Sequence, residues 1–184
     1  MARLHFIGGE KGGVGKSVVA RILAQYFIDR QIPFLGFDTS MLLGYQDFCA
    51  PPASTAGAKV TAGGWITTVL ADKGTFGLTA KADATGTSSS GNLTYQDHGV
   101  LDRTVKSTAV NSVTVTGNCA QILGTATVNG ASGYTFRLDV EDNGEPGKGN
   151  DRFRIRLDGP TTYDSNSFAP NGSLLSAGNI QVHK

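Results

Sequence analysis

The 184-residue chain has few residues that would cross-link or anchor it, with 2 cysteines, 1 tryptophan and 6 prolines. Charge of either sign is also not in excess, because 16 Lys and Arg face 15 Asp and Glu, a net charge of +1. This balance argues against a broad nucleic-acid-binding surface, which needs a clear basic excess. No apolar run approaches the roughly 18–20 residues of a membrane span. We therefore expect neither a specific nucleic-acid partner nor a membrane span.

The two cysteines, Cys49 and Cys119, lie far apart and lack metal-ligand spacing. We expect two free or buried thiols, with one disulfide as the alternative. The apolar stretch near the start, residues 4–7, is too short for a signal peptide. As written, the chain is therefore expected in the cytoplasm.

Glycine is abundant, at 25 of 184 residues, and the charged fraction is only 17%. The apolar pattern then divides the chain into three parts. Residues 1–40 have an α/β pattern, residues 41–59 resemble a linker rich in small residues and proline, and residues 60–184 alternate with a period of two. We predict a truncated β-α-β segment, a linker and an antiparallel β domain.

Within the first part, a glycine-rich turn separates a short apolar strand from an amphipathic helix. Glycines there let backbone N–H groups converge on phosphate oxygens, a lysine reaches the β/γ phosphates, and a serine hydroxyl binds magnesium. The motif predicts binding of ATP–Mg²⁺ or of a phosphate or sulfate ion. The alternative is a loop that keeps this geometry without tight nucleotide binding. Its residues are Lys11, Gly12, Gly13, Val14, Gly15, Lys16 and Ser17, of which Ser17 is the magnesium ligand.

This motif resembles the deviant Walker A box of the ParA/MinD family of partitioning ATPases. The resemblance implies that Lys11 reaches the phosphates of a partner subunit across a nucleotide-sandwich dimer. Asp38 matches the first of two acidic residues after the second strand of the family, whereas Ser40 replaces the second, which helps to position the attacking water. The Walker B strand is missing as well. ATP hydrolysis is therefore not expected, although Asp38 is kept as a candidate nucleotide-binding residue.

From about residue 60, apolar and polar residues alternate in runs at 75–82, 113–116, 134–141 and 152–157. Each run predicts an antiparallel strand with one buried and one solvent-exposed face. Roughly seven to nine such strands predict an antiparallel β-sandwich or small barrel, with no helix after residue 41. Turns are predicted at Ser90-Gly91, Gly117-Asn118, Asn129-Gly130 and Asn143-Gly144.

The β part also resembles a known family, the post-choice-of-anchor domain of exported bacterial surface proteins. The resemblance implies an extracellular β module of a binding or structural kind and names no reaction. The segments that carry it are residues 63–66, 91–99, 140–147, 151–157 and 178–184.

Three features of the β part are candidates for chemistry. Asp142, Asn143 and Glu145 offer hard oxygen ligands for calcium, with a solvated hairpin loop as the favoured alternative. Asp97-His98 suggests a catalytic pair, but no nucleophile motif accompanies it, so we expect a histidine in a turn.

The third feature is a row of arginines at 152, 154 and 156 on one strand face. They are suited to bind an anion or a polysaccharide carboxylate. The favoured alternative is pairing with Asp139 and Glu141 on a neighbouring strand.

The two resemblances imply different cellular locations, the cytoplasm for the phosphate-loop segment and the cell exterior for the β part. This difference predicts a natural or engineered chimera. The leading function is a non-enzymatic β-sheet binding or structural module, with a polysaccharide or surface ligand as partner, fused to an incomplete phosphate-loop segment. The alternative is a small ATP- or phosphate-binding protein that completes its fold by self-association through exposed sheet edges.

A thermal-shift titration with ATP–Mg²⁺ separates these two functions. If the phosphate loop binds nucleotide, millimolar ATP–Mg²⁺ raises the melting temperature of the wild type, because a ligand that binds only the folded state stabilises it. Lys16→Ala removes the phosphate-contacting ammonium and is expected to abolish the rise. An unchanged wild-type melting temperature would contradict the nucleotide-binding alternative.

Overall fold

The computed structural model describes residues 56–100, 102–166 and 172–183. The chain divides into two compact units, Met1–Leu43 and Gly44–Lys184, and the described residues all belong to the second. The predicted β-α-β segment and its phosphate-binding residues, from Lys11 to Ser17 together with Asp38, lie outside the described residues. Their nucleotide binding therefore stays a prediction.

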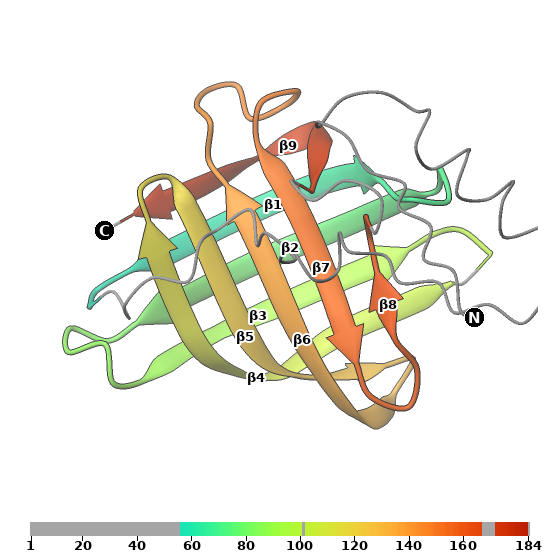
Figure 1. The fold of residues 1–184 in the computed structure, drawn as a ribbon, viewed down its shortest axis with the longest axis horizontal. Helices are drawn as coiled ribbons and strands as arrows, with labels where there is room; N and C mark the ends of the chain where they lie inside the picture. The colour runs from blue at the N-terminus through green and yellow to red at the C-terminus, as the bar shows by residue number, and fades with distance from the viewer. Residues whose placement is uncertain (1–55, 101, 167–171, 184) are drawn as a thin grey trace, which may run out of the picture. The chain divides into compact units, whose positions relative to one another are not determined.

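The described part consists of nine strands and contains no helix (Figure 1). This confirms the mainly β prediction for this part of the chain. No helix in the described residues is long and apolar enough to cross a membrane. The strands are β1 (Lys59–Thr67), β2 (Lys73–Ala82), β3 (Ser89–Asp97), β4 (Arg103–Thr116), β5 (Cys119–Val128), β6 (Ala131–Glu141), β7 (Arg152–Asp158), β8 (Tyr163–Asp164) and β9 (Ser173–His183).

Eight of these strands form a closed antiparallel barrel. The first seven follow one another as a meander, from β1 to β7. The last strand, β9, pairs with both β7 and β1 and so closes the sheet on itself. The two-residue strand β8 lies outside this ring and pairs with β7 alone. Of the two predicted architectures, the structure therefore has the barrel.

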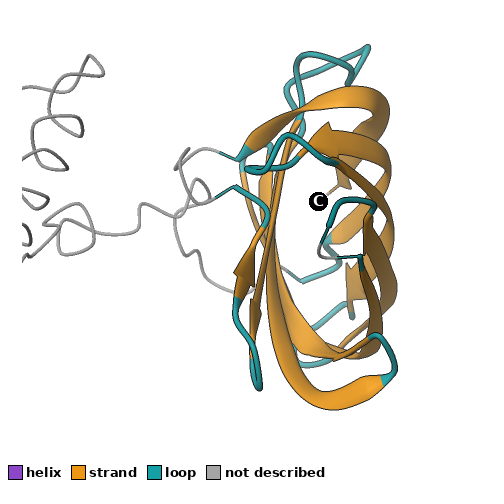
Figure 2. Cartoon of the chain, turned by 90° about the vertical axis from the view of Figure 1, so that its right-hand side faces the viewer, coloured by secondary structure: helices purple, strands orange, loops and turns teal. Residues whose placement is uncertain are grey.

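The barrel is flattened because two of its seams are short. β3 and β4 pair over four residues, and β7 and β9 over two. Longer ladders join the strands within each half, such as the nine residue pairs between β1 and β2. One half contains β9, β1, β2 and β3, the other β4 to β7, and Figure 2 shows them edge-on as two facing layers. This sandwich-like shape explains why the sequence was compatible with either architecture.

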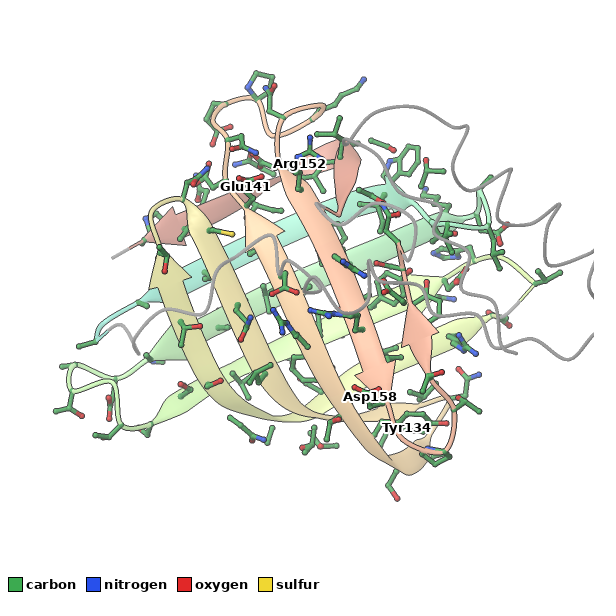
Figure 3. All side chains as sticks on the ribbon, viewed as in Figure 1. Tyr134, Glu141, Arg152 and Asp158 are labelled. Atoms are coloured by element: carbon green, nitrogen blue, oxygen red, sulfur yellow. The ribbon has the colours of Figure 1, made fainter. Side chains whose placement is uncertain are left out.

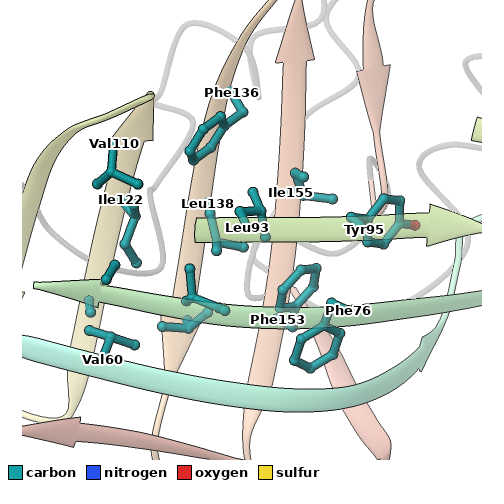
Figure 4. Packing of buried hydrophobic residues seen from close by; sticks show 14 of the residues in the cluster. Val60, Phe76, Leu93, Tyr95, Val110, Ile122, Phe136, Leu138, Phe153 and Ile155 are labelled. Carbon is teal, nitrogen blue, oxygen red and sulfur yellow. The ribbon is translucent and has the colours of Figure 1, made fainter. Parts of the chain in front are cut away.

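Alternate side chains of every long strand fill the space between the two halves (Figure 4). In β2, β6 and β7 the apolar residues predicted from the period of two are buried. Asp139 and Arg154, which that period places on the exposed face, are buried as well. Phe76 of β2 stacks on Phe153 of β7 across the barrel, with ring centroids 4.0 Å apart. Burying a side chain of this size contributes roughly 1.5–3 kcal/mol to stability. The main buried residues of these strands are Phe76, Leu78, Ala80, Tyr134, Phe136, Leu138, Val140, Phe153, Ile155 and Leu157.

Two predicted turns contrast in outcome. Asn129 and Gly130 join β5 to β6 with positive φ values of 50° and 82°, which confirms the Asn-Gly hairpin. The turn predicted at Ser90-Gly91 is wrong, because both residues lie inside β3 and Gly91 pairs with Ala80.

The chain instead reverses at residues 83–88, where Asp83 organises the turn. Its carboxylate accepts hydrogen bonds from the backbone N–H groups of Thr85 (3.2 Å) and Thr87 (2.9 Å) and from the hydroxyl of Ser88 (2.8 Å). An aspartate can build a turn through such local bonds without an Asn-Gly pair. The sequence analysis placed the turn at Ser90-Gly91 and did not identify Asp83 as a turn-forming residue.

Cys119, at the start of β5, is buried and disulfide-bonded. The expectation of two free thiols is therefore wrong for this residue. Cys49 lies outside the described residues. A disulfide depends on which residues the fold brings together, and spacing in the sequence does not report that.

Gly178 provides a test of this fold, because its φ is +108° and a Cβ there would meet the backbone of Gly63 and Gly64. Gly178→Ala is expected to destabilise the domain by about 1–3 kcal/mol. Gly63→Ala is the matched control on the neighbouring strand, because a Cβ at Gly63 meets nothing within 4 Å. Urea unfolding measures both variants, and equal midpoints would contradict the tight β1–β9 packing.

Candidate functional site

The outer face of β9, β1 and β2 presents uncharged polar side chains in register. Thr61 of β1 pairs with Gln181 of β9 on one side and with Thr79 of β2 on the other. These residues face outward because the residues next to them in each strand, such as Val60 and Ile180, are buried in the core. The alternation that builds the core therefore also gathers this polar row on the outside.

A shallow open depression lies on this face, and glycine forms part of its floor. Gly63 of β1 pairs with Gly77 of β2 and with Asn179 of β9. A Cβ at Gly63 would meet nothing within 4 Å, so the space above this backbone is open. The residues that line the depression are Thr61, Ala62, Gly63, Leu78, Thr79, Asn179 and Gln181.

Basic residues lie beyond each end of the depression. At one end, Trp65 of β1 holds the ammonium of Lys73, whose Nζ lies 5.1 Å from the centre of the indole ring. At the other end, Lys59 pairs directly with Lys81 of β2 and with His183 of β9. We call this arrangement the polar stripe. Its uncharged centre consists of Thr61, Gly63, Thr79, Asn179 and Gln181, and its basic ends of Lys73 on one side and Lys59, Lys81 and His183 on the other.

The acidic loop between β6 and β7 holds β9 in place beside this stripe. Asp151 accepts hydrogen bonds from the backbone N–H groups of Ile180 (2.8 Å) and Asn143 (2.9 Å). Asp142 accepts one from the N–H of Val182 (3.1 Å). Because β7 pairs with β9 over only two residues, these carboxylates supply acceptors for two further backbone N–H groups of β9, those of Ile180 and Val182.

The three predicted calcium ligands lie together in this loop, but their polar groups contact protein. Glu145 accepts a hydrogen bond from the side-chain amide of Asn179 (2.7 Å), and Asn143 donates to Glu141 (3.0 Å). In residues 56–100, 102–166 and 172–183, no group of three or more His, Cys, Asp and Glu side chains is placed to hold a metal ion. Calcium binding by Asp142, Asn143 and Glu145 stays a prediction.

The arginine row on β7 pairs with acidic residues, as the favoured interpretation predicted. Arg156 lies 2.9 Å from Asp139 of β6, and Arg152 lies 3.6 Å from Glu141. Figure 3 labels the Arg152–Glu141 pair where β6 ends and β7 begins.

The middle arginine of the row has a different partner. Arg154 bonds to Asp164 of β8 at 2.6 Å, a pairing the sequence did not predict. The missed partner belongs to a strand of two residues, which is too short to leave a periodic pattern.

Asp97 and His98 contact different partners in the structure. The buried Asp97 carboxylate accepts a hydrogen bond from the hydroxyl of Tyr163 (3.0 Å), which in turn lies 2.6 Å from the hydroxyl of Tyr95. The single proton of Tyr163 goes to Asp97, so Tyr95 must donate to Tyr163. Burial raises the pKa of both tyrosines. His98 directly follows the end of β3, and its ring lies 2.8 Å from the hydroxyl of Thr75.

Sequence reasoning missed the polar stripe altogether. Its residues come from strands that are up to 120 positions apart in the chain, such as Thr61 and Gln181. The sequence signal for it was the set of threonines, glycines and amide residues that alternate with the buried residues of the same strands. That signal becomes a site only once the register is known, since a shift of one residue would turn these side chains inward.

The chain was compared with protein-family models, curated proteins and solved structures, and none of the three comparisons found a match.

Two aspartates should contribute to stability with opposite dependence on pH. Burial raises the pKa of Asp151 above its usual value of 3.8, so its contribution to stability falls as pH rises through the interval between the two values. The Ser88 hydroxyl holds the pKa of Asp83 well below 3.8, so its contribution is present above 3.8 and is lost as pH falls.

Urea unfolding of the wild type, Asp151→Asn and Asp83→Asn between about pH 3 and pH 7 tests both signs. We expect the stability of the wild type relative to Asp151→Asn to decrease with rising pH. Relative to Asp83→Asn it should increase. Parallel profiles for the two variants would contradict the burial of Asp151.

Proposed function

We propose that the β domain is a non-enzymatic binding module that holds an extended polar ligand on the outer face of β9, β1, β2 and β3. A polysaccharide or another surface ligand is the partner that this proposal favours. The observation that carries it is the open depression around Gly63, bordered by hydroxyl and amide side chains.

The packed interior supports a ligand site on the outside. Buried apolar side chains from both halves meet in one cluster, which includes Phe76, Leu93 and Phe153 (Figure 4). A barrel with a filled interior leaves its outer surface and its loops for recognition.

The distribution of hydrogen bonds supports this particular face. The buried carboxylates of Asp97, Asp139 and Asp151 bond to groups of the protein itself. In contrast, the side chains of Thr61 and Gln181 have no hydrogen-bond partner among the described residues. Polar groups that the fold does not use are suited to recognise the hydroxyls of a ligand.

Two further observations favour a module that works outside the cytoplasm. The resemblance to post-choice-of-anchor domains implies an exported protein, and the disulfide bond of Cys119 suits an oxidising compartment. The nucleotide-binding alternative rests on residues outside the described part of the chain, and the titration with ATP–Mg²⁺ tests it separately.

Amide NMR spectra of the full chain with cellohexaose and with hexagalacturonate test the proposal. We expect a ligand to shift the amide signals of Thr61, Gly63, Gly77 and Thr79. Gly63→Gln fills the depression with a side chain and is expected to weaken binding at least about tenfold, about 1.4 kcal/mol.

Leu123→Gln is the matched control, because it introduces the same side chain at an exposed position of β5 on the other half of the barrel. It should leave the affinity unchanged. The proposal fails if neither sugar shifts these amides, or if Gly63→Gln binds as tightly as Leu123→Gln.

A further inference from the structure

The charges on the proposed binding face have one sign. Strands β1, β2, β3 and β9 contain a single carboxylate, Asp97, and it is buried at 1% exposure. Lys59 and Lys81 are exposed, as is His183. The exposed charges within these four strands are therefore all basic.

The other half of the barrel shows that this is not a property of the whole domain. On β6 and β7, Arg152 and Arg156 each pair with a carboxylate of the neighbouring strand. The chain as a whole has a net charge of only +1. Acidic residues are thus available in the sequence, but the four strands of this half expose none of them, and Glu145 reaches Asn179 of the stripe from the β6–β7 loop.

Lys59 and Lys81 stand directly opposite each other in adjacent strands. Like charges at such positions destabilise a sheet. Neither lysine forms an ion pair with another described residue. Two exposed lysines at directly paired positions, without a counter-charge, form a site that an anion would stabilise.

The basic groups are spaced along the stripe. Lys73 and Lys81 lie at opposite ends of β2, eight residues or about 26 Å apart at strand geometry. Between them lie the glycine floor and the uncharged side chains of Thr61 and Gln181. A ligand that matches both regions is extended, anionic and rich in hydroxyl groups.

We propose that the ligand of this face is an acidic polysaccharide, whose carboxylates pair with Lys59 and Lys81 while its hydroxyls bond to Thr61, Thr79 and Gln181. This inference rests on the proposed function and specifies the ligand class. The face favours a sugar over a single-stranded nucleic acid, because nucleic-acid platforms stack successive bases on aromatic rings. Its one tryptophan, Trp65, already holds Lys73.

The decisive experiment compares hexagalacturonate with its full methyl ester, which has the same sugar chain without the charges. We expect the acid form to bind the wild type at least about tenfold more tightly than the ester, with the advantage decreasing as salt is added. The double variant Lys59→Gln/Lys81→Gln should bind the acid and the ester equally.

Lys148→Gln is compared with Lys81→Gln as a matched pair, because each removes one exposed lysine and Lys148 lies in the β6–β7 loop. Only Lys81→Gln should weaken acid binding. Melting temperatures check the fold, and Lys81→Gln is expected to melt no lower than the wild type because it relieves repulsion.

The outcomes separate the two proposals. Equal affinity of acid and ester, with the stripe amides shifted by both, overturns the acidic ligand and leaves the binding module in place. No shift of these amides by either sugar, or by cellohexaose, overturns the binding module as well. Tighter binding of oligothymidine than of hexagalacturonate at the same amides overturns the polysaccharide assignment.

Discussion

Closure of the barrel depends on hydrogen bonds along both edges of β9. On one side, β9 pairs with β1 over eight residue pairs, but on the other it pairs with β7 over only two. Carboxylates of the β6–β7 loop supply the missing acceptors, Asp151 to Ile180 and Asp142 to Val182. Buried N–H groups left without partners would cost about as much as lost hydrogen bonds. The loop thereby completes the barrel that the strands alone leave partly open.

This closure also sets the position of the proposed site. Asn179 of β9 accepts a hydrogen bond from the N–H of Gly147 in the same loop and donates one to Glu145. With β9 held in this register, Gln181 and Asn179 come to lie beside Thr61 and Gly63. The acidic loop that the sequence suggested as a calcium site therefore contributes to the polar stripe by holding one of its strands.

The two halves of the barrel use charge differently. On β6 and β7, basic and acidic side chains pair with each other, and Asp139 is enclosed between Arg137 and Arg156. On β9, β1, β2 and β3, the exposed charges are basic and unopposed by carboxylates of those strands. In the first half carboxylates balance the arginines, whereas Lys59 and Lys81 of the second half form no ion pair with a described residue.

The sequence by itself determined the mainly β class, the inward apolar residues of β2, β6 and β7 and the Asn129-Gly130 hairpin, because a period of two and a turn that needs positive φ are local properties. It did not determine the role of Asp83, the partner of Arg154 or the gathering of Thr61, Gly63 and Gln181. These depend on strand register and on the closing contacts of β9, which join residues far apart in the chain. Only the tertiary structure decides such contacts, because pairing between distant strands is chosen by burial and edge closure across the whole barrel.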